Sequence, residues 1–331
     1  LMIPLLFLGY KSITMCVVIT IVNIIVLLSN YLYCRKKLNI YIKFLGFDKF
    51  LFKTIFGYSF FIFLGVFVDK INWSVDQFIL GAVSGSVAVS IYAIASQLNT
   101  LFINLSTAIS GVLLPKVSKM IANKATNEEL TDEFIKVGRI QYLIIFLMAS
   151  GLAMFGKEFI ITWVGENFIE SYYMALILIV PLCFPLIQNL GISIMQAKNM
   201  HKFRSVLLVV IAIINIIISI PLAKTYNGIG SAIGTSISLV IGNIIILNVY
   251  YQKKVGINVI KFWNEIIKMT IPLIIPIVII LILMNFIVLH GYTYIIVFGS
   301  IYTIIYIITC YYTVMNKYEK CIINKIVKNL I

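Results

Sequence analysis

Three charged residues lie within an apolar stretch that is long enough to cross a membrane. Residues 54–80 carry Asp69, Lys70 and Asp76 among Phe, Ile, Leu and Val side chains. Asp69 and Asp76 are seven residues apart, so a helix places both carboxylates on one face, with Trp73 near them. A carboxylate at mid-membrane depth costs about 2.5–3.5 kcal/mol, and it normally faces a wet cavity or a partner. These residues predict a polar cavity where carboxylates bind a cation or exchange protons.

A second interpretation of the same stretch stays open. If the helix ends at residue 68, the segment DKINWSVDQ is an outer loop and its charges are solvated. Lys70 points about 100° away from Asp69 around a helix axis, so it is not expected to be its direct partner. We favour the cavity, because charges are rare inside membrane spans.

The composition places the chain in a membrane. Of its 331 residues, 61% are hydrophobic and 11% are charged, which is far outside the range of soluble domains. The long apolar runs predict an all-α, polytopic membrane protein. The predicted spans lie near residues 10–33, 54–80, 87–114, 139–156, 171–197, 205–223, 229–250, 269–289 and 294–314.

The net charge of +14 follows the predicted topology. All but four of the 26 basic residues fall in connections on one side of the nine spans; the exceptions are Lys11, Lys70, Lys157 and Lys224. The positive-inside rule makes that side cytoplasmic, so we expect a multi-pass protein of the inner (cytoplasmic) membrane with its C-terminus inside. The basic excess therefore reports topology and contact with anionic lipid, and it does not indicate nucleic-acid binding.

The chain is expected to be the C-terminal part of a longer protein, because it starts at Leu1 in apolar sequence. We assign residues 1–33 to the last helix of an N-terminal lobe and 34–53 to a cytoplasmic amphipathic linker. Residues 54–250 are expected to form a six-helix lobe. Residues 251–331 are expected to add two helices and a basic cytoplasmic tail.

Two further predicted spans carry polar side chains. Span 87–114 has a stripe of polar and small residues at spacings of three and four: Gln97, Thr100, Asn104, Thr107 and Gly111. Span 171–197 has two prolines four residues apart, which are expected to kink it, followed by the amides Gln188 and Asn189. Such residues line a cavity or bond to neighbouring helices, and the sequence leaves both open.

Local signals predict several boundaries. Pro115 is expected to end span 87–114, and Thr126 with Glu129 forms a capping box that opens a short helix ending at Lys136. Residues 157–170 are predicted to be the largest outer loop. The segment KTYNG (224–228) is expected to turn a hairpin between spans 205–223 and 229–250. In its second arm, Gly230 and Gly234 allow another helix to pack closely.

Several kinds of chemistry are not supported by the sequence. The two histidines, His201 and His290, are expected on opposite membrane sides, and no two cysteines have ligand-like spacing, so no metal site is predicted. The segment GLAMFGK (151–157) lacks the Ser or Thr of a P-loop and follows no strand. We therefore expect neither a cofactor nor an enzyme, and any uphill work would come from an ion gradient or from consumption of product outside.

Five segments of the chain form a recognisable set of motifs: GYSFFIFLGVFVD (57–69), VDQFILG (75–81), ISGVLLPKVSKM (109–120), FGKEFIITWVG (155–165) and GIGSAIGTSISL (228–239). They resemble motifs of bacterial polysaccharide repeat-unit flippases, closest to those for capsule or O-antigen. The resemblance covers nearly the whole chain, and the family belongs to the multidrug/oligosaccharidyl-lipid/polysaccharide exporter superfamily.

The resemblance implies a MATE-like helical bundle of about 14 spans, of which about nine lie in this chain. It implies a substrate, undecaprenyl-diphosphate-linked oligosaccharide, that crosses the cytoplasmic membrane, with membrane lipid around the protein and H⁺ or Na⁺ as coupling ion. Polysaccharide polymerase machinery is an expected partner. The charged cavity residues of the family map onto Asp69, Lys70 and Asp76, and Arg139 is a further candidate for contacting the diphosphate.

Three alternatives remain at this point. A cation-coupled multidrug exporter of the same superfamily would have a similar fold. A membrane polysaccharide polymerase or acyltransferase would need catalytic His, Arg or carboxylate groups on substantial loops, and the longest outer loop has only about 14 residues. A structural scaffold is disfavoured if Asp69 and Asp76 are buried.

Overall fold

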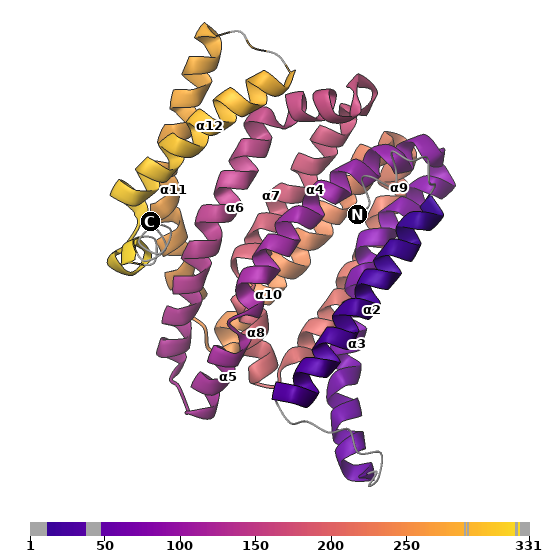
Figure 1. The fold of residues 1–331 in the computed structure, drawn as a ribbon, viewed down its shortest axis with the longest axis vertical. Coiled ribbons are helices and arrows are strands. Elements are labelled where there is room, and N and C mark those ends of the chain that lie inside the picture. The colour runs from indigo at the N-terminus through magenta and orange to yellow at the C-terminus, as the bar shows by residue number, and fades with distance from the viewer. Residues whose placement is uncertain (1–11, 38–47, 288, 290, 322–323, 325–331) are drawn as a thin grey trace. The chain divides into compact units, whose positions relative to one another are not determined.

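A computed structural model describes residues 12–37, 48–287, 289, 291–321 and 324 (Figure 1). These residues form helices and short connections, and no strand occurs among them. The predicted all-α fold is therefore confirmed. The chain divides into two compact units, Leu1–Gly57 and Tyr58–Ile331, which we describe separately.

The first unit contains α2 (Ser12–Lys37) and the first residues of α3 (Lys49–Val83). Asp48 begins α3, because its Oδ1 accepts hydrogen bonds from the amides of Phe50 at 2.9 Å and Leu51 at 3.1 Å. The helix therefore starts several residues before the predicted residue 54. Most of the predicted linker, residues 38–47, lies outside the described residues.

The second unit holds the rest of α3 and all later elements. Its α-helices are α4 (Gly85–Gly111), α5 (Leu114–Ala122), α6 (Asn127–Val164), α7 (Glu170–Ile187), α8 (Leu190–Ala197), α9 (His201–Leu239), α10 (Leu247–Tyr250), α11 (Val259–Phe286) and α12 (Gly291–Thr309). Short 3₁₀ and π-helical turns are η1 (Glu166–Phe168), η2 (Val240–Ile246), η3 (Tyr251–Val255) and η4 (Cys310–Val314). α3 runs without a break through Asp69 and Asp76, so the predicted alternative of an outer loop there is wrong.

Eight helical stretches of the described residues are long and apolar enough to cross a membrane, one fewer than predicted. The difference lies in His201–Val255, a stretch of 55 residues that contains both predicted arms of the hairpin. At about 1.5 Å per residue this would be about 80 Å of helix, far more than one crossing needs. Asn227 breaks the stretch, with φ 50° and ψ −132°, inside the predicted turn. The hairpin is therefore confirmed.

The predicted boundaries around α6 are partly wrong. Thr126 and Glu129 form the predicted capping box, with Thr126 Oγ1 accepting from the Glu129 amide at 3.2 Å. The helix does not stop at Lys136, however, and continues for 38 residues to Val164. No proline occurs between Asn127 and Val164 to end the helix. A side chain at Gly138 would collide with Phe262, so glycine leaves the space that this ring fills.

The connection after α6 is shorter than the outer loop predicted over residues 157–170. Gly165, with φ 104°, the single turn η1 and Ile169 separate α6 from α7. Pro181 and Pro185 lie inside α7, which runs unbroken through both, and the predicted span 171–197 is interrupted after them, between Ile187 and Leu190. Pro115 lies in the first turn of α5, just after α4 has ended at Gly111.

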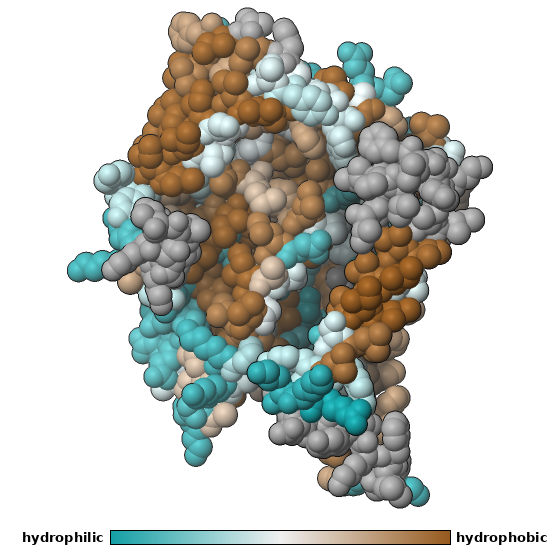
Figure 2. Space-filling model, viewed as in Figure 1, coloured by the Kyte–Doolittle hydropathy of each residue, from teal (hydrophilic) through white to brown (hydrophobic). Residues whose placement is uncertain are grey.

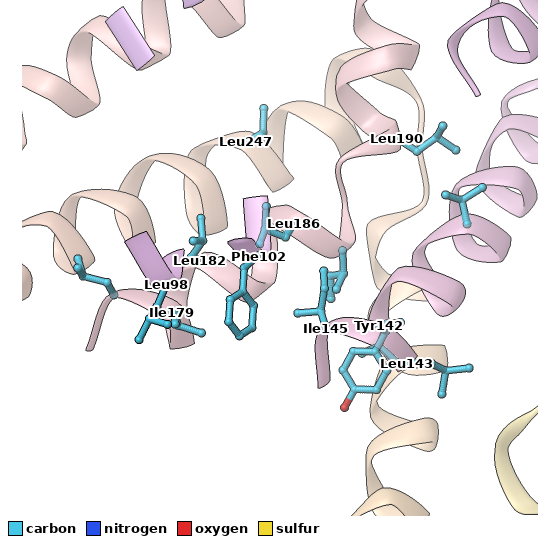
Figure 3. Packing of buried hydrophobic residues seen from close by; sticks show 14 of the residues in the cluster. Leu98, Phe102, Tyr142, Leu143, Ile145, Ile179, Leu182, Leu186, Leu190 and Leu247 are labelled. Carbon is cyan, nitrogen blue, oxygen red and sulfur yellow. The ribbon is translucent and has the colours of Figure 1, made fainter. Parts of the chain in front are cut away.

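The core of the second unit is made by α4, α6, α7 and α9, and α11 and α12 pack against α6. Figure 3 shows Leu98 and Phe102 of α4 beside Ile179, Leu182 and Leu186 of α7. Buried side chains of α11 and α12 pack into this core, among them Phe262, Tyr302 and Tyr306.

Three connections whose basic residues predict that they lie on the same side of the membrane contact one another in the structure: those before α6, between α8 and α9, and after α9. Lys198, between α8 and α9, donates to Val255 O at 2.7 Å and to Asn127 Oδ1 at 3.1 Å. Burial lowers the pKa of this ammonium group. We call this part of the second unit its basic end. Figure 2 shows hydrophilic side chains gathered there around α5 and the start of α6, below apolar helix surfaces.

Candidate functional site

Asp76 is the most deeply buried acid of the described residues. Its carboxylate has no solvent exposure and accepts three hydrogen bonds. Tyr92 of α4 donates to Oδ2 at 2.7 Å, Ser231 of α9 donates to Oδ1 at 2.7 Å, and Thr235 of α9 donates to Oδ2 at 2.6 Å. Three helices therefore meet at one carboxylate inside a membrane span.

Asparagine side chains extend this cluster. Asn215 Oδ1 accepts from Ser219 Oγ at 2.6 Å and from Thr235 Oγ1 at 3.1 Å. Its Nδ2 donates to Asn72 Oδ1 of α3 at 3.2 Å. We call the set of Asn72, Asp76, Tyr92, Asn215, Ser219, Ser231 and Thr235 the Asp76 cluster.

The Asp76 cluster contains no basic group, and no described Lys, Arg or His forms an ion pair with its carboxylate. No group of three or more His, Cys, Asp or Glu residues that could hold a metal occurs in the part of the chain that the structure describes. Carboxylate, amide and hydroxyl oxygens are nevertheless the ligands of hard cations. The arrangement can also hold a proton on Asp76, since a buried carboxylate without a cationic partner is expensive.

The hairpin in α9 positions the cluster. Ser231 and Thr235 are four residues apart on the second arm, so they lie on one face, and Asn215 and Ser219 do the same on the first arm. A Cβ at Gly234 would overlap Ser219, 2.9 Å from its backbone nitrogen. The absent side chain is what lets the two arms approach and their polar residues meet.

A second buried polar cluster lies where the helix breaks between α7 and α8. Ser106 Oγ of α4 donates to Leu186 O at 2.7 Å and accepts from Asn189 Nδ2 at 3.2 Å. Gln141 Nε2 of α6 donates to Ser106 O at 3.1 Å, and Gln188 Nε2 donates to Asn248 Oδ1 at 2.7 Å. These bonds stabilise backbone and side chains around a break that would otherwise leave buried groups unpaired.

A cavity of about 120 Å³ lies between α3, α4, α7, α8, α9 and the turns after α9. Apolar side chains from α7 and α10 wall one side, including Leu182, Leu186 and Leu247, which Figure 3 labels. Its other lining includes Trp73 and several polar residues: Asn72, Thr107, Asn189, Arg204, Asn243 and Tyr251. A smaller adjoining cavity shares Ile192 and Arg204 with it. Asn72 belongs both to this lining and to the Asp76 cluster.

Comparison with known proteins identifies the family of the chain. A family model described as "Polysaccharide biosynthesis protein" matches residues 1–173, just over half of the chain. The chain belongs to this family. A solved structure titled lipid II flippase MurJ, in an inward closed conformation, has a similar fold with a TM-score of 0.60 and 20% sequence identity. The similarity covers 80% of this chain and 55% of the flippase, so the chain spans about half the length of that protein. No match was found among curated proteins.

The structure places the predicted charged residues in different surroundings. Asp76 is buried, Trp73 is half-buried in the cavity wall, and Lys70 is exposed. The side chain of Asp69 lies outside what the structure describes. Asn189 lines the cavity, whereas Gln188 is buried and bonded to Asn248 beside it.

The predicted polar stripe on α4 is exposed along its whole length. Gln97 and Asn104 have no hydrogen-bond partner among the described residues, and Thr107 reaches the cavity rim. The opposite face of α4 is the buried one, with Tyr92, Asn99 and Ser106. Asn99 is fully buried, and neither atom of its amide has a described partner. The stripe therefore does not pack inside this unit.

Arg139 is held by acidic groups. Its Nε donates to Glu319 Oε1 at 2.7 Å, its Nη1 to Glu265 Oε2 at 3.3 Å, and its Nη2 to Val314 O at 3.0 Å. Glu319 is itself buried. All three guanidinium nitrogens are thus engaged in joining α6 to α11 and to the segment after α12. A diphosphate would have to displace these bonds.

The sequence did not single out Arg204 or the hydroxyls around Asp76. Arg204 stands in a short basic loop, KNMHKFR, and such loops are usually solvated. The serines and threonines of α9 resemble packing residues at glycine-rich helix surfaces. The available signal was their spacing, because Asn215/Ser219 and Ser231/Thr235 each repeat at four residues and face the same hairpin interior.

Proposed function

We propose that the intact protein flips an undecaprenyl-diphosphate-linked oligosaccharide across the cytoplasmic membrane during capsule or O-antigen synthesis. In this proposal it is a transporter rather than an enzyme. It exchanges access between the two sides, and an H⁺ or Na⁺ gradient drives it through the Asp76 cluster. A polymerase on the far side would use the delivered repeat units.

The observation that carries the proposal is the double role of Asn72. Its side chain lines the cavity, and its Oδ1 accepts from Asn215, which bonds to Thr235 and hence to Asp76. A change in ion occupancy at Asp76 can therefore alter the cavity wall through two amides. Family membership and the likeness to a lipid II flippase support a lipid-linked substrate.

The exposed polar stripe on α4 fits the same proposal. A lipid-linked sugar has a polar head that must avoid hydrocarbon while its tail stays in lipid. Polar, unbonded side chains such as Gln97 and Asn104 are costly against lipid, and they suit a face that lines a pathway between two lobes.

Vesicles containing the purified intact protein should flip the substrate. With a fluorescently labelled undecaprenyl-diphosphate oligosaccharide in both leaflets, we expect a membrane-impermeant quencher to bleach nearly all the label. Protein-free vesicles should lose only the outer-leaflet signal. An imposed ion gradient should accelerate the protein-dependent phase, because coupling links ion binding to the access change.

Protection of the inner-leaflet label in the presence of folded protein would refute the flippase assignment. Efflux of cationic drugs without any flipping would instead favour a multidrug exporter. Cells that lack the intact protein should hold their lipid-linked repeat units on the inner leaflet and lose surface polymer.

We also propose that the basic end faces the cytoplasm, since it carries most of the basic residues. In a variant without other cysteines, Lys254→Cys should resist a membrane-impermeant thiol reagent added to intact cells. The matched variant Lys224→Cys lies beside the turn at Asn227 and should be labelled. Both side chains are exposed in the structure, so accessibility itself does not separate them. The opposite labelling pattern would invert the orientation.

A further inference from the structure

The cavity near the basic end has hydrogen-bond donors that nothing in the described residues satisfies. Arg204 lines it, is half-buried, and forms no ion pair with a described carboxylate. The hydroxyl of Tyr251, which is fully buried, has no hydrogen-bond partner among the described residues. The amide of Asn243, also in the lining, bonds to no described residue. This excess of donors suits a ligand whose oxygens only accept, such as a phosphate.

The position of Arg204 adds to this demand for an anion. Arg204 lies in the first turn of α9, which contains no acidic residue, and the residue before the helix, Met200, provides no side-chain cap. The start of a helix carries a partial positive charge, so acidic groups are usual there and a further cation is unfavourable. A bound anion would offset both charges.

Stacked aromatic rings fix the geometry of the two donors. Phe203 and Tyr250 stack with ring centroids 3.6 Å apart and planes within 3°. Their chain neighbours, Arg204 and Tyr251, are therefore held on adjacent helical segments and line the same cavity. Gly191 makes room for the Tyr251 ring, since a Cβ there would lie 2.6 Å from the hydroxyl oxygen. The donors are thus arranged before any ligand binds.

Apolar residues of α3 form part of the wall of the adjoining cavity. Its wall includes Ile62 and Val66, and the side chain of Val66 is 57% exposed. A ligand with its phosphate at Arg204 can therefore keep a hydrocarbon chain against α3, in lipid. Free inorganic phosphate would make no use of this wall.

We propose that Arg204 and Tyr251 form a binding subsite for the phosphate of a phosphate-bearing lipid. The subsite rests on the proposed function only for the identity of its ligand. If the protein is a flippase, the lipid is the substrate itself, bound through its diphosphate. An anionic phospholipid carries the same chemistry. In either case Arg204 contacts two phosphate oxygens and Tyr251 donates its hydroxyl to a third.

Binding of farnesyl diphosphate and of phosphatidylglycerol to the intact protein in phosphatidylcholine nanodiscs tests the subsite. We expect Arg204→Gln to raise the Kd about 10- to 100-fold, as is typical for loss of a hydrogen bond to a charged group. Tyr251→Phe should raise it about three- to tenfold. Lys202→Gln is the matched control. It removes the same charge two residues earlier in the first turn of α9, from an exposed side chain outside both cavities, and should change the Kd less than about twofold.

The two lipids distinguish the possible ligands. If Arg204→Gln weakens the binding of farnesyl diphosphate alone, the ligand is the substrate diphosphate. If it weakens the binding of both lipids equally, the ligand is a phospholipid. If Arg204→Gln behaves like Lys202→Gln for both lipids, the subsite is refuted. Should Arg204→Gln fail to fold, Arg204→Lys keeps the charge and removes the two-pronged contact, so its Kd should still rise.

The flipping assay separates this proposal from the proposed function. A wild-type protein that binds farnesyl diphosphate through Arg204 and yet does not flip the labelled oligosaccharide would retain the subsite and lose the flippase assignment. If the wild-type protein flips the oligosaccharide, and Arg204→Gln binds and flips equally well, the flippase assignment stands and the subsite is refuted.

Discussion

Replacing Asp76 by Asn in the intact protein is expected to reduce ion-driven flipping by more than about tenfold, while the protein still reaches the membrane. The carboxylate is the one formal charge in the Asp76 cluster. Its loss removes charged interactions of about 1.5–3 kcal/mol, which weakens ion binding by roughly 10- to 100-fold. The amide has the same shape, and its oxygen still accepts from Ser231 or Thr235, so the helices should remain packed.

Two measurements check this expectation: surface polymer on cells, and gradient-driven flipping in vesicles. Asp48→Asn is the matched control, because Asp48 is exposed and caps α3 through Oδ1, which Asn retains. Normal flipping by Asp76→Asn, with an unchanged response to the gradient, would remove the Asp76 cluster from the coupling mechanism.

A comparison of the wild-type protein with Asp76→Asn can also identify the coupling ion. If Na⁺ occupies the oxygens of Asp76, Asn215 and Thr235, wild-type flipping should rise with Na⁺ at constant pH, and Asp76→Asn should lose that rise. If Asp76 carries a proton, flipping should respond to the pH gradient and ignore Na⁺. Tyr92→Phe should shift either response, because it removes one of the three hydroxyls on the carboxylate.

Adding a single methyl group at Gly234 is expected to destabilise the second unit by about 1–3 kcal/mol. The new Cβ would lie 2.9 Å from both Cα and N of Ser219, and backbone atoms cannot move aside as a flexible side chain does. The two arms of the α9 hairpin would have to separate. Thr235 would then withdraw from Asn215, and Ser231 O from Ser219, so transport should fall together with stability.

The midpoint of thermal unfolding in detergent, measured for Gly234→Ala, tests this prediction. Gly151→Ala is the matched control, since it makes the same change within a long helix where no atom lies within 4 Å of the new Cβ. There Ala should be neutral or stabilising by up to about 1 kcal/mol, because Gly is the poorer helix former. Equal midpoints for the two variants would show that close packing at Gly234 is unimportant.

The sequence alone determined the class of the protein and much of its local structure. Long apolar runs leave only helices that cross a membrane, because lipid cannot satisfy an unpaired backbone group. Short-range signals placed the hairpin turn at Asn227, the capping box at Thr126 and the end of α4 before Pro115, since each acts within a few residues. Helical periodicity also predicted that Asp69 and Asp76 share one face with Trp73 near them, and of these three side chains the structure describes Trp73 and Asp76.

Which face of each helix lies inside was decided only by the tertiary structure. In a soluble helix the polar face marks the outside, but in lipid both faces are apolar and no such contrast exists. On α4 polar residues lie on both faces: Gln97 and Asn104 are exposed, while Tyr92 and Ser106 are buried on the opposite face, so polarity alone did not mark the buried side.

The partners of the functional groups were also beyond the sequence. Asp76 is bonded to Thr235, which is 159 positions away, and Arg139 to Glu319, which is 180 positions away. Arg204 becomes part of a cavity only because α9 begins beside α8 and the turns after α9. Local periodicity states which residues share a face, whereas the pairing of faces depends on how all the helices pack together.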